Sequence, residues 1–112
     1  MRNIKMTYYS IQEIPPRKPA EGIEMRAFHG ECMTFAYFTF APGTPLPEHR
    51  HPHEQIGTVV KGKMQLTIAG DTRVVSPGGA YHIPSNTVHS ARCLEGAAEV
   101  IEMFAPVRED YK

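Results

Sequence analysis

The chain carries a tight cluster of residue types that bind metal ions. His49, His51, His53 and Gln55 stand at every second position within residues 43–62, and half of the six histidines lie within five residues. Because alternate side chains of a strand point to one face, these four polar groups are expected to converge. Neutral imidazole binds divalent transition metals, and the Gln55 amide oxygen could add a donor. A solvated, proline-punctuated loop is the alternative, but clustering at this spacing favours a metal site.

A second segment, residues 78–93, follows after fifteen residues and brings one more histidine, His89. Together the two segments resemble the paired sequence motifs of the cupin superfamily. The matching positions are Gly43, His49, His51, Gln55 and Gly62 in the first segment and Gly78, Pro84 and His89 in the second. Three positions depart from the usual pattern: Gln55 stands where glutamate is usual, Asn86 where glycine is, and Cys93 where asparagine is. Asn86 can replace glycine because asparagine accepts left-handed turn conformations.

The resemblance implies an all-β, single-domain cupin spanning residues 1–112, that is, a double-stranded β-helix or jelly-roll barrel. It also implies that His49, His51, Gln55 and His89 hold one divalent transition metal and leave a position for substrate or water. Gln55 keeps an oxygen donor but removes the charge of glutamate, so the ion would polarise a bound oxygen more strongly. A neutral ligand set does not select among Zn, Ni, Mn, Co and Fe.

Short strand-like segments separated by turns must position these residues. Proline and glycine make up 19 of the 112 residues, and we find no convincing helical repeat, which indicates an all-β sandwich or barrel. We expect an N-terminal arm or edge strand in residues 1–17, with its strand at 7–11, and a loop at 19–22. The remaining predicted strands are 23–28 paired with 33–40 as a hairpin, 56–60 paired with 63–69 as a second hairpin, and 72–75, 80–83, 87–94 and 97–105.

The bulk properties restrict the partners. Twelve Lys and Arg balance twelve Asp and Glu, so charge gives no reason to expect nucleic acid or an anionic membrane surface as a partner. No apolar run is long enough to span a membrane, and the first residues do not resemble a signal peptide, so we expect a cytoplasmic protein. Its partners would be a small molecule and, as in many cupins, a second copy in a homodimer. Cys32 and Cys93 are predicted to be free and mostly buried.

The end of the chain narrows the resemblance. Residues 101–110 and 51–55 resemble those of the small pectin-degradation cupins, which open the ring of 4,5-unsaturated uronates to a linear keto form. The resemblance implies that Glu102, Phe104 and Arg108 surround the metal, although the acidic residue of that group is usually aspartate. Arg108 would pair with the sugar carboxylate, Glu102 would move a proton, and Phe104 would form an apolar wall. The alternative is that Glu102 is a surface strand residue and 108–110 a solvated tail.

The strand period places Glu102 between apolar side chains. Val100, Glu102 and Phe104 would share one strand face, so burial among apolar side chains should raise the pKa of Glu102.

We interpret the protein as a metal-dependent enzyme of the isomerase type that linearises unsaturated uronates by non-redox Lewis-acid and acid/base catalysis. A metal-dependent dioxygenase and a non-catalytic small-molecule or metal-binding cupin are the alternatives. The roles of His53, Tyr81, His82 and Cys93 stay open at this point.

Overall fold

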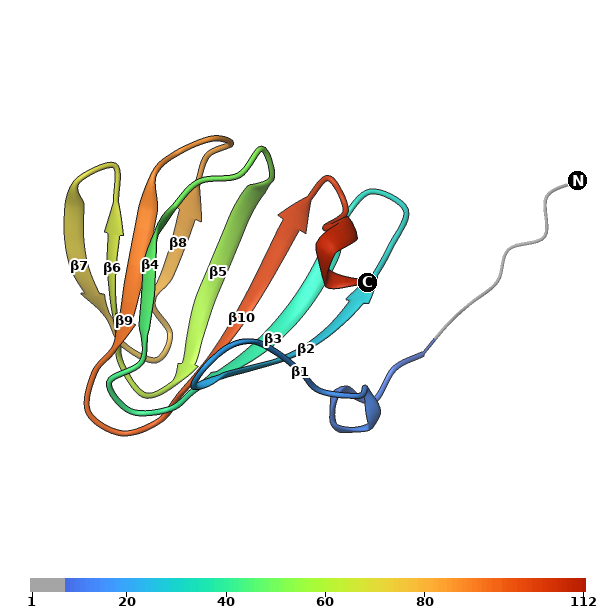
Figure 1. Ribbon diagram of the computed structural model, residues 1–112, viewed down its shortest axis with the longest axis horizontal. Coiled ribbons are helices and arrows are strands. Elements are labelled where there is room, and N and C mark those ends of the chain that lie inside the picture. The colour runs from blue at the N-terminus through green and yellow to red at the C-terminus, as the bar shows by residue number, and fades with distance from the viewer. Residues whose placement is uncertain (1–7) are drawn as a thin grey trace, which may run out of the picture.

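Two antiparallel sheets contain all ten strands of the described residues. The computed structural model describes residues 8–112. Its six-stranded sheet has the order β1-β2-β3-β10-β5-β8, and its four-stranded sheet has the order β4-β9-β6-β7. Figure 1 shows β4, β9, β6 and β7 grouped on one side of the molecule and the C-terminal turn beside the end of β10. The predicted all-β architecture is confirmed.

After β3 the chain crosses repeatedly between the two sheets. The strands are β1 Arg17–Ala20, β2 Ile23–His29, β3 Thr34–Phe40, β4 Pro45–His49, β5 Glu54–Lys61, β6 Met64–Ile68, β7 Asp71–Val75, β8 Ala80–Ile83, β9 His89–Cys93 and β10 Ala98–Ala105. Two single turns of 3-10 helix complete the described residues, η1 Ile11–Glu13 and η2 Glu109–Tyr111. Neither turn has the length or the apolar character needed to cross a bilayer, and residues 8–112 contain no other helix.

The core lies between the two sheets and follows from the strand period of two. On β3 and β10 alternate residues are buried, and the neighbours between them are exposed or half-buried. Phe38, Val100 and Met64, from β3, β10 and β6, belong to one buried apolar cluster that joins the sheets. Each such side chain contributes about 1.5–3 kcal/mol on burial. The polar exceptions on these inward faces mark the functional site.

The predicted hairpin between 56–60 and 63–69 is wrong. β5 pairs with β10 and β8, whereas β6 pairs with β7 and β9, so the chain crosses from one sheet to the other after Lys61. Gly62 makes this crossing with φ +79°, and a Cβ atom there would lie 2.3 Å from the carbonyl oxygen of Ala97. Only glycine fits, because it tolerates both the left-handed backbone and the close approach. The other predicted hairpin, β2 with β3, is confirmed.

The N-terminal region also differs from the prediction. Residues 8–10 are irregular and Ile11–Glu13 is a 3-10 turn, so the expected strand at 7–11 is absent from its described part. The edge strand is instead β1, which replaces part of the loop expected at 19–22. Tyr9 stacks on Phe28 at 4.4 Å between ring centroids, and the Arg26 guanidinium donates to two carbonyl oxygens of residues 12 and 14. The start of the predicted arm, residues 1–7, lies outside the described residues.

The two cysteines are both free, as predicted, but only one is buried. Cys93 at the end of β9 is fully buried in the core, whereas Cys32, in the β2–β3 turn, is exposed. A turn between two strands offers little for a small apolar side chain to pack against, which explains the difference.

Candidate metal centre and its cavity

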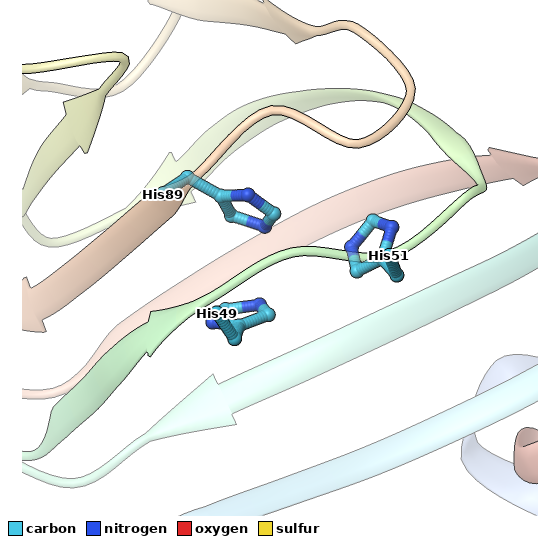
Figure 2. A group of neighbouring side chains, drawn as sticks. All are labelled: His49, His51 and His89. Carbon is cyan, nitrogen blue, oxygen red and sulfur yellow. The ribbon is translucent and has the colours of Figure 1, made fainter.

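Three histidines converge at one end of the sandwich. His49 is the last residue of β4, His89 is the first residue of β9, and the two are directly paired across these strands. His51 follows in the loop after β4. Figure 2 shows the three rings gathered around one space, with His49 and His51 coming from one segment and His89 from the other. One ligand atom of each lies within 4.8 Å of the others, close enough to share a metal ion.

His49, His51 and Gln55 come together as expected, but His53 does not join them, and the expected cause, a single strand, is wrong. Residues 49–55 do not form one strand, because β4 ends at His49 and β5 begins at Glu54 in the other sheet. The chain turns through residues 50–53 as it changes sheets, and this turn brings His51 beside His49 and aims Gln55 into the space between the sheets. The side chain of His53 does not belong to the group of three, although its backbone carbonyl oxygen bonds the ring of His51.

Each histidine is oriented by a backbone carbonyl oxygen. A carbonyl oxygen only accepts, so the bonded ring nitrogen, Nδ1 in all three cases, must carry the proton, and Nε2 is left with a free lone pair. Nε2 of His89 is buried without a partner among the described residues. Burial lowers the pKa of both His51 and His89, which favours the neutral form of each imidazole. The three bonds join His49 to Pro47 (2.7 Å), His51 to His53 (3.0 Å) and His89 to Thr87 (2.7 Å).

Gln55 supplies a fourth donor atom to this space. It is buried on β5, and its Oε1 lies 3.1 Å from Nε2 of His51. Its amide nitrogen donates to Oε2 of Glu102. With Nδ1 of His51 protonated and the amide nitrogen turned to Glu102, two lone pairs face each other at 3.1 Å. Such a contact is unfavourable unless a cation or a proton lies nearby. Three imidazole nitrogens and one amide oxygen therefore fit a divalent transition metal.

Glu102 is a buried carboxylate in the middle of β10. Only 7% of it is exposed, and its inward-facing neighbours along the strand are Val100 and Phe104. Burial raises its pKa, opposed by hydrogen bonds from Gln55 and Tyr81 and by the charge of Arg108. The expected direction of the shift is found, and the alternative of a surface strand residue is wrong.

Tyr81 is the site residue that the sequence left undecided. Its hydroxyl donates to Oε2 of Glu102 at 3.0 Å, and its burial strongly raises its own pKa. His82 points the other way and pairs with exposed Glu54 at 2.7 Å. The signal that could have found Tyr81 is Gly57, its direct partner on β5, which leaves room for the large ring.

The C-terminal turn closes the site. The Arg108 side chain is only 11% exposed, so it does not belong to a solvated tail. Its Cζ lies 4.8 Å from the ring centre of Phe104 and 4.1 Å from that of Tyr111, within the range of cation–π attraction. Asp110 pairs with the guanidinium. Neither Asp110 nor Tyr111 is among the residues that the sequence predicts for the site.

Most of the predicted site residues line one cavity. It has a volume of about 100 Å³, and its lining includes His49, His51, Gln55, Glu102, Phe104 and Arg108. His89 lines a smaller cavity of about 20 Å³ together with Tyr81. Gln55 and Glu102 line both cavities, as do Phe40 and Leu46, so the two cavities are neighbours.

Comparison with known proteins agrees with this architecture. Residues 36–104 match the family model described as a cupin domain. The chain belongs to the cupin family. This cupin is 28% identical to the pectin degradation protein KdgF of Dickeya dadantii (strain 3937) over 106 residues, which cover 93% of the chain and 96% of that protein. The solved structure of KdgF from Halomonas sp. is 30% identical, superposes with a TM-score of 0.90, and is matched over 96% of this chain and 100% of its own.

A third relative has a different architecture. The HTH-type transcriptional regulator PuuR of Escherichia coli (strain K12) is 29% identical over 93 residues, which are 78% of this cupin but 50% of the regulator. The cupin thus spans about half of that protein.

Cys93 lies outside the site of this cupin. It is at the opposite end of β9 from His89, where its thiol donates to the carbonyl oxygen of Gly96 at 3.3 Å. Burial raises the pKa of this thiol. Cys93 is therefore a structural core residue.

Proposed function

We propose that this cupin is a divalent-metal-dependent enzyme that opens the ring of 4,5-unsaturated uronates to the linear keto form. The observation that carries the proposal is that His49, His51, a buried carboxylate and an arginine seated on aromatic rings line one small cavity, and that His89 completes the group of three imidazoles beside it. The similarity to two KdgF proteins, one of them named for pectin degradation, supports the choice of substrate class.

His49, His51, Gln55 and His89 would hold the metal. Their donor atoms come from neutral groups, so Zn, Ni, Mn, Co and Fe are all compatible with the site. When bound, the ion would supply Lewis-acid polarisation of a substrate oxygen.

Glu102 is the proposed proton carrier. Ring opening removes a proton from the anomeric hydroxyl, and the following tautomerisation adds one at C4, so the isomerisation consumes no proton overall. One carboxyl group that first accepts and then donates completes this balance. Its Oε2 already receives bonds from Gln55 and Tyr81, and no hydrogen bond within residues 8–112 involves Oε1. Oε1 is therefore the atom that would exchange the proton with the sugar.

Arg108 and Phe104 would bind and orient the substrate. A guanidinium pairs with a carboxylate through two parallel hydrogen bonds, which fixes both the position and the plane of the sugar acid. Phe104 is 2% exposed and lies beside both Arg108 and His51, so it would form the apolar wall between the carboxylate and the metal ligands.

The decisive experiment follows the ultraviolet absorbance of the conjugated double bond in unsaturated galacturonate, mannuronate and guluronate. Metal-loaded protein should remove the absorbance faster than the uncatalysed background. His89→Ala should return the rate to background, whereas His82→Ala, a matched histidine that points away from the cavity, should not. No acceleration with any of the five metals would refute the proposal, and oxygen uptake in its place would identify a dioxygenase.

We also expect this enzyme to be a homodimer. Ile56 and Met103 face each other in register on the outer surface of the six-stranded sheet and are 50% and 41% exposed. Sedimentation velocity would test the expectation, and a monomer across micromolar concentrations would contradict it.

A further inference from the structure

The guanidinium of Arg108 has one occupied edge and one free edge. Asp110 accepts from Nε at 3.0 Å and from Nη2 at 2.8 Å, which is the side-on, bidentate arrangement. A guanidinium carries five N–H donors in a planar fork, so three remain on Nη1 and the outer side of Nη2. No acceptor within residues 8–112 bonds Nη1. The free edge has the geometry that receives a second carboxylate end-on.

The occupied edge faces solvent. The Asp110 side chain is 58% exposed, whereas that of Arg108 is 11% exposed, so Asp110 approaches the guanidinium from outside. Arg108 lines the 100 Å³ cavity and Asp110 does not. Asp110 is therefore a support behind the arginine and leaves the cavity side of the guanidinium open.

Two perpendicular aromatic rings hold the guanidinium in place. Phe104 and Tyr111 meet at 87° with ring centres 5.6 Å apart, and Arg108 lies over both faces. Tyr111 is itself held against Phe38 of the core, with ring centres 6.2 Å apart. The backbone N–H of Arg108 donates to Oγ1 of Thr34 at 2.9 Å, which fastens the start of the turn to β3. The arginine thus lies in a rigid corner on the cavity wall.

The charge of Arg108 acts on the metal centre. It lowers the pKa of His51 and of His89, after the larger effect of burial, and it lowers that of Glu102. A carboxylate bound at the free edge would consequently be held close to the proposed proton carrier and the imidazoles.

We propose that Asp110 and Tyr111 are positioning residues that hold Arg108 as a receptor for one planar carboxylate, and that they make the cavity select sugar acids over neutral sugars. The identity of the reacting sugar rests on the proposed function, but the selection itself is a binding property. Asp110 fixes the rotation of the guanidinium in its plane, and Tyr111 fixes the plane. The charge of Arg108 alone would attract anions without orienting them.

The test compares the dissociation constants of D-galacturonate and its methyl ester on metal-loaded protein by calorimetry. These saturated sugars lack the conjugated double bond and are not consumed by the proposed reaction, so binding is measured without turnover. We expect the parent to prefer the acid by about tenfold or more, and Asp110→Asn to reduce that preference by about tenfold, as for the loss of a charge-assisted bond. Glu109→Gln removes the same charge from the same turn and should keep the preference.

A second pair of variants tests the aromatic corner independently. Tyr111→Leu should lose the preference for the acid, and Tyr111→Phe, which keeps the ring, should restore it. Equal preference in the parent, an unchanged preference in both Asp110→Asn and Tyr111→Leu, or an equal loss in Glu109→Gln would overturn the proposal.

The two proposals can fail separately. If the protein selects the acid through Asp110 but does not linearise unsaturated uronates, the carboxylate receptor stands and the proposed function fails. If it linearises the uronates but binds the acid and the ester equally well, the proposed function stands and the carboxylate receptor is refuted.

Discussion

The hydroxyl of Tyr81 and the side-chain amide of Gln55 bond the same carboxylate oxygen, Oε2 of Glu102. The three residues come from β8, β5 and β10, which are neighbours in the six-stranded sheet. Because Glu102 accepts from the amide nitrogen of Gln55, the amide oxygen must point the other way, to His51. The Glu102 carboxylate thus orients Gln55, the proposed fourth metal ligand, and is itself held by the Tyr81 hydroxyl.

Removing the Tyr81 hydroxyl should weaken catalysis more than substrate binding. Tyr81→Phe leaves Glu102 with one donor on Oε2, so its carboxylate is less well fixed. Loss of a partner behind a metal site commonly costs about 10–100-fold in activity or metal affinity, and we expect kcat to fall about tenfold with KM nearly unchanged. Steady-state kinetics on uronates would measure this. Tyr37→Phe is the matched control, since Tyr37 bonds Glu99 in a similar pair on the outer face of the sheet.

Gly57 should be irreplaceable for the same reason. A Cβ atom at this position would lie 2.5 Å from the Tyr81 hydroxyl oxygen, so Gly57→Ala must displace the ring. We expect a loss of about 1–3 kcal/mol in the free energy of unfolding, the usual cost of overpacking, together with the fall in kcat of Tyr81→Phe. Chemical denaturation and kinetics measure the two effects. Gly30→Ala, whose added atom would make only ordinary contacts, should be nearly neutral, and equal costs at both glycines would contradict the packing argument.

Gln55→Glu should make the metal-free protein less stable and its stability more dependent on metal. The substitution replaces the donor that faces Glu102 by a second carboxylate, and two adjacent buried carboxylates cannot both ionise readily. We expect Tm without metal to fall by about 5–10 °C, on the scale of about 4–8 °C for each kcal/mol in a domain of this size. Added divalent metal should raise Tm more than in the parent.

Differential scanning calorimetry with and without chelator measures the Tm of Gln55→Glu and of the parent in the metal-free and metal-loaded states. Gln65→Glu, on half-buried β6, is the control, because Gln65 faces neither Glu102 nor the histidines. A larger metal effect in the control than in Gln55→Glu would show that the carboxylate pair is not the cause.

The stability of the metal-free protein should respond to pH through Glu102. Its pKa is raised by burial, so the folded protein retains this proton at pH values where the unfolded chain has lost it. The stabilising contribution of the protonated group is therefore complete below the unfolded pKa and is lost as the pH rises through the folded pKa. Urea unfolding from about pH 4 to about pH 8 should show that the free energy of unfolding of Glu102→Gln increases relative to that of the parent as the pH rises. A constant difference across this range would mean that Glu102 titrates normally.

Local patterns in the sequence were sufficient to predict most strands. The alternation of Val100, Glu102 and Phe104 identified an inward face. Turn residues separated the strands, but turn chemistry does not reveal which strands pair. A β-hairpin and a crossing between two sheets both need a glycine such as Gly62, so the β5–β6 connection could not be assigned without the partners of each strand.

The convergence of His49, His51 and His89 could be predicted from the spacing within the two motifs. Tyr81, Asp110 and Tyr111 could not be found in this way. Tyr81 reaches Glu102 only because β8 and β10 lie on either side of β5, and Arg108 meets Tyr111 only because the chain turns back on the cavity. These relationships depend on the order of strands in a sheet and on the path of the last turn, which no single segment encodes.

The chain crosses between the two sheets at both ends, after Lys61 at the Gly62 end and through residues 50–53 at the histidine end. At the histidine end the sheets also face each other through side chains, because His49 and His89 belong to one sheet and Gln55 to the other. A cation shared by these donors would act as a removable cross-link between the layers. Amide protons at the ends of β4 and β9 next to the histidines should then exchange faster after chelation, while those beside Gly62 keep their protection. Loading with metal would then control how far the two sheets separate at the histidine end.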